Sequence, residues 1–237
     1  MNRIAPLLLA AGLAQGAVAQ DIRSAAYGTP TDSYGHGAVA QGEWATILFG
    51  FDDLSSESHA IAPWVFEDTQ PRLVDLDGDG ASEVVTVVSL TGQGAAIWVW
   101  AMTADGPQVV ARTAPIGQHH RWLAIAGIGD LDGDGRFEIA YVDRPHLARI
   151  LRVVAVNVEA GQWSLVAVAE APGHTNHHFG SPVIEGGLRD CGVPEIVTAD
   201  AGWSRILATR LEQGQLVGRD LGPYSGEGSM AAALACG

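Results

Sequence analysis

Acidic side chains recur at alternate positions in two short stretches of the sequence. The first stretch is DLDGDGASE, from Asp75 to Glu83, and the second is DLDGDGRFE, from Asp130 to Glu138. Both follow the pattern DxDxDGxxE, in which a glycine after the third aspartate lets the chain turn tightly around a common centre. Calcium prefers six to eight oxygen ligands, so the pattern predicts one calcium site in each stretch.

The predicted ligands are the four carboxylates of each stretch and the backbone carbonyl of its seventh residue. They are Asp75, Asp77, Asp79, Ala81 and Glu83 in the first stretch, and Asp130, Asp132, Asp134, Arg136 and Glu138 in the second. Acidic, glycine-rich loops also occur as solvated turns that hold no ion. The presence of two near-identical copies favours calcium, and we expect its role to be structural.

Segments rich in β-branched and aromatic residues follow both acidic stretches, with the sequences VVTVVS and IAYVD. Such residues are typical of strands. An EF-hand would need a glutamate at the twelfth position, inside a helix, where this sequence has Thr86 and Tyr141. Each acidic loop is therefore predicted to lead into a strand.

A third, degenerate copy of the pattern begins at Gly187. Its glycine and its final glutamate are retained as Gly192 and Glu195, but the three aspartates are replaced by Gly187, Arg189 and Cys191. Without these carboxylates the third copy is expected to bind no calcium.

The three copies recur at intervals of roughly 56 residues, and each interval contains runs typical of four strands. In the interval best marked by turn residues, the runs are 123–129, 137–142, 150–157 and 163–169. Repeats of this length with four strands indicate the blades of a β-propeller. The predicted fold is all-β, a propeller of about four four-stranded antiparallel blades. Residues 22–27 and 230–236 are predicted strands that could form a composite fifth blade from the two ends of the chain.

With these loops and this spacing, the chain resembles the FG-GAP, or VCBS-repeat, family of calcium-loop propellers, which includes integrin α-subunit heads. The resemblance extends over residues 65–210. The strings RLVDLDGDG, DLDGDGRFEIAYVDRPHL and GLRDCG are also similar to those of exported alphaproteobacterial VCBS-repeat proteins. The resemblance implies a propeller fold and bound calcium, and it implies no particular reaction.

The first 19 residues have the features of a secretory signal peptide. Arg3 precedes an apolar run, and small residues lead to a predicted cleavage between Ala19 and Gln20. We therefore expect an exported protein, periplasmic or extracellular, with one domain at residues 20–237. No other segment is apolar enough over a sufficient length to predict a membrane span.

The chain carries a net charge of −14 at pH 7. Nucleic acids are poor candidates for a partner because their phosphates would be repelled, and anionic membrane surfaces are disfavoured for the same reason. An acidic chain is instead compatible with binding cations.

Cys191 and Cys236 are the only two cysteines. An even number of cysteines in an oxidising compartment predicts a disulfide between them. Two buried thiols are the alternative.

Polar and aromatic residues gather in connections that a propeller would place on one rim. Because strands alternate in direction within a blade, connections between blades share a rim with the turns between the second and third strands. We call this set the histidine rim: His36, His119, His120, Arg121, Asp143, His146, His174, His177, His178, Trp203 and Arg205. The rim is predicted to bind an unknown protein, a small molecule or a saccharide. The alternative is that these are solvated loop residues whose histidines hydrogen-bond their own turns.

Motifs of known catalytic machinery are missing from the sequence, including the GxSxG elbow, the phosphate-binding loop and the helical HExxH zinc motif. The predicted function is therefore a binding module without turnover. The rival hypothesis is a metal-assisted or acid/base lyase or hydrolase, acting for instance on saccharides, that uses His120, His177, His178, Arg121 and Asp143. A transition metal bound at the rim would favour this rival.

Overall fold

The structure is a computed structural model, and it describes residues 21–236. The predicted signal peptide lies outside the described residues. Strands make up nearly all of the regular structure, and the described part of the chain has one helix, α1 (Glu227–Leu234). The predicted all-β class is confirmed. Between residues 21 and 236, no helix has the length and apolar character needed to cross a bilayer.

The first sheet is antiparallel and has eight strands. These are β1 (Ile22–Thr31), β2 (Glu43–Phe51), β3 (Ser56–Ala60), β4 (Val65–Phe66), β5 (Arg72–Val74), β6 (Glu83–Leu90), β7 (Gly94–Thr103) and β8 (Gly106–Arg112). The main path is β1-β2-β4-β6-β7-β8, with β3 paired to β2 and β5 paired to β6.

The short strand β4 lies between β2 and β6 and joins them into one sheet. Phe66 of β4 pairs with Trp44 of β2 on one side, and Val65 pairs with Ser89 of β6 on the other. Both residues of β4 are fully buried. Buried backbone groups need hydrogen-bond partners, and β4 finds them on both of its edges.

The second and third sheets are also antiparallel. The second has the order β12-β11-β10-β9, formed by β9 (Leu123–Gly129), β10 (Glu138–Asp143), β11 (Ile150–Glu159) and β12 (Gln162–Pro172). It contains the four strands predicted for this interval. The third sheet has five strands: β13 (His174–Thr175), β14 (Gly187–Asp190), β15 (Pro194–Asp200), β16 (Arg205–Glu212) and β17 (Gln215–Pro223).

The C-terminal segment corrects one prediction. Residues 230–236 were predicted to form a strand, but most of them belong to helix α1, which contacts β14 and β15. The segment is rich in alanine, which has the highest helix propensity, and Met230 alone is buried, against Val197, Ala199 and Ile206. Strand β1 pairs with β2 instead of with the C-terminal end. The predicted composite blade is therefore not formed by the described residues.

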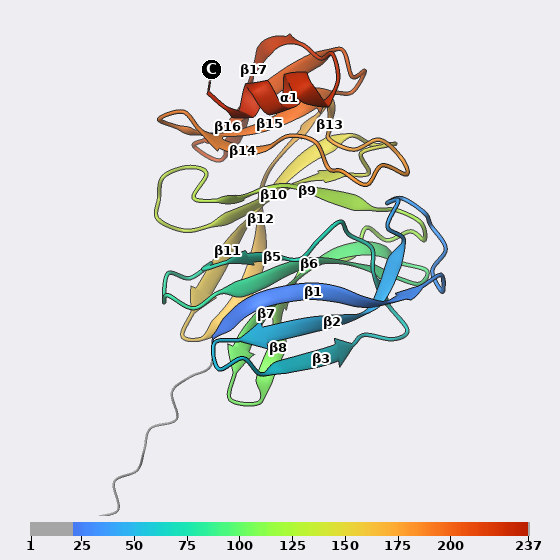
Figure 1. Ribbon diagram of the computed structural model, residues 1–237. Helices are drawn as coiled ribbons and strands as arrows, with labels where there is room; N and C mark the ends of the chain where they lie inside the picture. Colours follow the sequence, from blue (N-terminus) through green and yellow to red (C-terminus); the bar gives the residue numbers. More distant parts are fainter. Residues whose placement is uncertain (1–20, 237) are drawn as a thin grey trace, which may run out of the picture.

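The sheets follow one another from the one that contains β1 to the one that contains β17 and α1, as Figure 1 shows. Strand β12 contacts both β8 and β17, and β9 contacts β14. The first and last parts of the chain also meet through loops. The Gly180 amide donates to the Ala38 carbonyl at 2.8 Å, and Val39 bridges to Ser181.

The main core fills the space between the sheets. It includes Val85, Ile97, Leu123 and Ile139 from four different strands, together with Trp122 just before β9. Strand β6 is buried along its whole length, which explains why its sequence is apolar on both faces. These rigid inner strands hold the acidic loops and the histidine-bearing connections in fixed positions.

Candidate functional site

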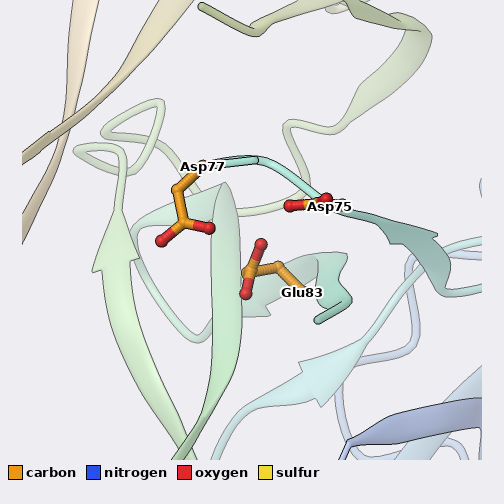
Figure 2. Close-up of side chains that lie close together, drawn as sticks. All are labelled: Asp75, Asp77 and Glu83. Atoms are coloured by element: carbon orange, nitrogen blue, oxygen red, sulfur yellow. The ribbon is translucent and has the colours of Figure 1, made fainter. Parts of the chain in front are cut away.

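In each acidic loop three carboxylates converge. The groups are Asp75, Asp77 and Glu83 in the first loop, and Asp130, Asp132 and Glu138 in the second. In each group, one oxygen of every carboxylate lies within 4.8 Å of the others. Figure 2 shows the first group, with Asp75 and Asp77 on the loop and Glu83 facing them. Both groups could hold a metal ion.

The first aspartate of each loop folds the backbone. Asp75 accepts hydrogen bonds from the Gly78 amide at 2.8 Å and from the Gly80 amide at 3.1 Å. Gly78 and Gly80 have φ values of 76° and 92°, which favour glycine. The second loop repeats both bonds from Asp130, at 2.7 and 3.0 Å. The repeated sequence thus produces the same local turn twice.

The glutamate that ends each loop is the first residue of a strand, β6 or β10. Glu83 is 4% exposed and Glu138 is 2% exposed. Each accepts one backbone hydrogen bond, from Leu76 at 2.8 Å or from Leu131 at 2.9 Å. Burial, followed by the charges of the neighbouring aspartates, raises the pKa of both glutamates to about 7. A bound cation would stabilise the ionised forms of these carboxylates.

The fifth position of each loop lies outside the three-carboxylate groups. Asp79 accepts a hydrogen bond from the Ala81 amide at 2.7 Å. Asp134 accepts from the Arg136 amide at 2.8 Å, and the Arg136 guanidinium pairs with the same carboxylate. The structure therefore brings together three of the four predicted carboxylates, and ligation by the fifth and seventh positions stays a prediction.

In the third, degenerate loop a guanidinium takes the place of the second aspartate of the pattern. Arg189 replaces the second aspartate of the pattern, and its Nε and Nη2 donate to Glu195 at 3.0 and 2.6 Å. Arg210 and Arg219 donate to the other Glu195 oxygen at 3.0 and 2.9 Å. Hydrogen bonds from Arg219, and then from Arg189 and Arg210, lower the pKa of Glu195 to about 2. An internal cation thus neutralises the glutamate that ends this loop.

The predicted disulfide between Cys191 and Cys236 is confirmed, with the two Cα atoms 5.7 Å apart. Cys191 occupies the position of Asp79 and Asp134 in the other loops. The bond joins the third loop to Cys236, two residues after the end of helix α1 at Leu234. It therefore fastens the end of the chain to the third sheet.

Part of the histidine rim surrounds a pocket with a volume of about 290 Å³. The pocket is lined by His36, His120, Arg121, Trp122, Arg144, His146, Leu147 and Phe179. These residues come from four connections that are far apart in the sequence. The structure thus brings together four members of the predicted rim.

Buried polar groups hold the histidines of the pocket. The His36 ring stacks on His120 with centroids 5.0 Å apart, and its Nδ1 lies 2.7 Å from the Glu67 carboxylate. Glu67 is fully buried and also accepts from Ser89 at 2.5 Å. The His120 ring is held by the Tyr34 carbonyl at 2.9 Å from its Nε2. Sequence reasoning did not assign Glu67 or Tyr34 to the site, because neither belongs to a recognisable motif.

The other rim residues do not line this pocket. His119 stacks on His120, while His178 stacks on Trp203 with centroids 3.7 Å apart. Asp143 pairs with Arg144 and Arg152, and Arg205 pairs with Asp220. Within residues 21–236, the rim offers no group of three histidine or carboxylate ligands close enough to share an ion.

A short chain of neutral imidazoles lies beside the pocket. His146 Nε2 lies 3.0 Å from His177 Nδ1, and His177 Nε2 lies 3.0 Å from the Ser181 carbonyl. Since a carbonyl only accepts, His177 donates from Nε2 and accepts at Nδ1. Burial is the main cause that lowers the pKa of both rings to about 4.

Comparison with known families identifies part of this chain. Residues 71–141 match the family described as FG-GAP-like repeat. This segment is an FG-GAP-like repeat. It contains both three-carboxylate groups, together with strands β5 to β9. The predicted family is confirmed over this range. A comparison with curated proteins found no match.

Acid should destabilise the protein through His174, which lies outside the FG-GAP-like repeat. His174 is 5% exposed, its Nδ1 lies 2.8 Å from the Thr198 hydroxyl, and burial lowers its pKa to about 4. An unfolded histidine has a pKa of about 6.5, so its contribution is complete above that pH and is lost as the pH falls toward 4. The lost contribution is about 3 kcal/mol at most.

The measurement is urea unfolding of wild type and His174→Asn between pH 7 and pH 4. The acidic loops are identical in both proteins, so their titration cancels in the difference. The variant should lose less stability than wild type over this range. Equal losses would contradict a buried, neutral His174.

Proposed function

We propose that this chain is an exported β-propeller that calcium stabilises and that serves as an interaction module, without catalytic turnover. One observation supports calcium most directly. In the two loops that keep their aspartates, the converging, buried glutamate forms no ion pair with a residue between 21 and 236. The loop that lost its aspartates instead supplies Arg189 to the matching glutamate. The third loop thus supports the presence of a positive charge at the same position in the two acidic loops.

The chemistry of the acidic loops fits calcium. Every converging ligand is a carboxylate oxygen, which hard cations prefer, and the loop offers further oxygens at its fifth and seventh positions. Asp75, Asp77, Asp79, Glu83 and the Ala81 carbonyl would hold one ion, and their counterparts from Asp130 to Glu138 would hold the other. Calcium would fix the corner that enters β6 or β10, which is a structural role.

A four-bladed ring is the proposed architecture. The second sheet is one complete four-stranded unit, and β14 to β17 supply another. Backbone hydrogen bonds of Ala38 and Ala40 with Gly180 and Ser181 join the first unit to the last. Closure through loops would replace the strand pairing between the two ends that the sequence predicted.

The histidine rim is the proposed interaction face. FG-GAP-like repeats suggest an interaction module, and the rim holds the pocket that unites several connections. Export is proposed from the sequence of residues 1–19, and a disulfide is compatible with an oxidising compartment.

Calcium should raise the thermal stability of the purified protein. With a dissociation constant of about 0.1 mM, each site adds about 1.4 kcal/mol at 1 mM calcium. Two sites together should raise the melting temperature by roughly 5–10 °C relative to EDTA. Calorimetry and elemental analysis would measure this shift and the stoichiometry. No shift would contradict calcium binding, and stoichiometric zinc, copper or iron would favour the rival enzyme.

The effect of Asp132→Asn on stability should reverse when calcium is added. The substitution keeps the oxygen that accepts from the Asp134 amide, but it removes one charge next to Glu138. In EDTA the variant should be at least as stable as wild type, because repulsion is relieved. In 1 mM calcium it should melt at a lower temperature, because one site is weakened. Asp105→Asn, which removes an exposed carboxylate outside both loops, is the matched control and should show neither effect.

A further inference from the structure

We propose that the pocket between His36 and His146 binds a small organic carboxylate that has an apolar body. The proposal deepens the proposed function, since it assigns a ligand class to part of the histidine rim. None of the residues that line this pocket is acidic, although the chain as a whole is strongly negative. Two carboxylates, of Asp143 and Glu67, contact residues of the lining, and both already have partners in the protein. Asp143 pairs with Arg144 and Arg152, and Glu67 is bound by His36 and Ser89.

Arg121 supplies the charge that a ligand would meet. Every arginine in the described part of the chain forms an ion pair with a carboxylate, except Arg112, Arg121 and Arg149. Arg121 lines the pocket, and its Nη1 donates to the His120 carbonyl at 2.9 Å. That bond orients the guanidinium and leaves further N–H donors. The planar fork of a guanidinium matches the two oxygens of a carboxylate.

Arg149 does not line the pocket, but its positive charge acts on His146, which does. It lies close enough to His146 for its charge to disfavour the protonated ring, and its Nε is buried without a hydrogen-bond partner. The imidazole rings at the pocket carry no negative charge that would repel an anionic ligand. His120 and His177 each have a ring nitrogen against a backbone carbonyl, so these rings are fixed by the protein.

The apolar side chains in the walls of the pocket favour a ligand with an apolar body. Phe179 is 60% exposed and Leu147 is 62% exposed, although both are large apolar side chains. They lie at the same pocket, which also has the indole of Trp122 in its lining. Phe179 is held edge-on against His36 and His146, with centroids 5.8 and 5.2 Å apart. Of the two arginines in the lining, Arg144 is paired with Asp143, which leaves Arg121 as the charged group available to a ligand. Exposed apolar side chains around a concave site with such a group are typical of a ligand pocket.

Benzoate is the test ligand, and benzamide is its neutral counterpart of the same shape. Titration of the full chain, followed by the tryptophan and histidine ring signals in ¹H–¹⁵N spectra, should give saturable binding of benzoate with a dissociation constant of about 1 mM. Benzamide should bind roughly tenfold more weakly, because it lacks the charge that pairs with Arg121. Inorganic phosphate should not compete at equal concentration, because it has no apolar body to contact the walls of the pocket. Equal binding of benzamide, competition by phosphate, or no saturable binding of benzoate would each overturn the proposal.

Substitutions in the pocket test which side chains contribute to the affinity for benzoate. Arg121→Gln should weaken benzoate roughly tenfold or more, whereas Arg112→Gln, which removes an unpaired arginine outside the pocket, should change it less than about twofold. Phe179→Ala is a second variant at an exposed position, where loss of folding is not expected, and it should also weaken benzoate. Unchanged affinity in both pocket variants would overturn the proposal. Calcium-dependent melting is measured separately, so a protein that is stabilised by calcium but does not bind benzoate refutes only the carboxylate site.

Discussion

Substitution of Glu195 by glutamine should lower the free energy of unfolding by about 3–5 kcal/mol, with or without calcium. Glu195 is 1% exposed and accepts hydrogen bonds from Arg189, Arg210 and Arg219. Glutamine keeps the shape but leaves three guanidiniums facing a neutral amide. Chemical denaturation of the variant and wild type in EDTA, and again in 1 mM calcium, gives the measurement.

The loss of stability caused by Glu195→Gln should become smaller as the pH falls. The folded pKa of Glu195 is about 2, below the value of about 4.3 in an unfolded chain. The stabilisation from its charge is therefore present above pH 4.3 and lost as the pH falls toward 2. The difference between Glu195→Gln and wild type should shrink over the same range.

Glu138→Gln is the matched control, because Glu138 holds the same position in an intact acidic loop. Glutamine retains an oxygen to accept from the Leu131 amide. In EDTA the substitution should be neutral or stabilising, since it removes a buried carboxylate whose pKa is raised to about 7. In calcium it should destabilise. If both glutamates respond alike in EDTA, Arg189 does not take the place of an ion.

Removal of the disulfide should cost about 4 kcal/mol, because Cys191 and Cys236 are 45 residues apart and the bond restricts a long loop of the unfolded chain. This corresponds to a decrease in melting temperature of roughly 8–16 °C. A single calcium site is expected to add only about 1.4 kcal/mol. Cys191→Ser should therefore destabilise more than Asp132→Asn does in calcium.

The control is Cys191→Ser combined with Cys236→Ser, which leaves no free thiol. This double variant should unfold like reduced wild type, and a reductant should not change it further. Helix α1 should stay folded on the third sheet in the native state, because Met230 remains in the core and Arg189 still donates to the Ala233 carbonyl. A loss no larger than that of Asp132→Asn would contradict the dominant role of the disulfide.

Local pattern was enough to predict the acidic loops, since their geometry depends on contacts within nine residues. Asp75 and Asp130 bind amides three and five positions ahead, and the glycines supply the required backbone conformation. The four strands of the second sheet were predictable for a similar reason, because turn residues separate their β-branched runs.

Helix propensity and strand pairing explain where the structure departs from the predictions or goes beyond them. Residues 230–236 were assigned to a strand to complete a ring, but alanines favour a helix and only Met230 reaches the core. Strand β4 has two residues, too few for any periodic pattern, and it forms because it pairs with β2 on one edge and with β6 on the other.

The sequence alone determined that carboxylates would converge at two corners and that a third corner had lost them, because side-chain spacing within one turn decides this. The identity of the groups that replace the lost acids, and the set of rim residues that meet, depend on how the strands pack. Arg210 and Arg219 reach Glu195 across strands, and Glu67 reaches His36 from another connection. Partners that lie 15 to 31 residues apart are selected by packing, which no local spacing encodes.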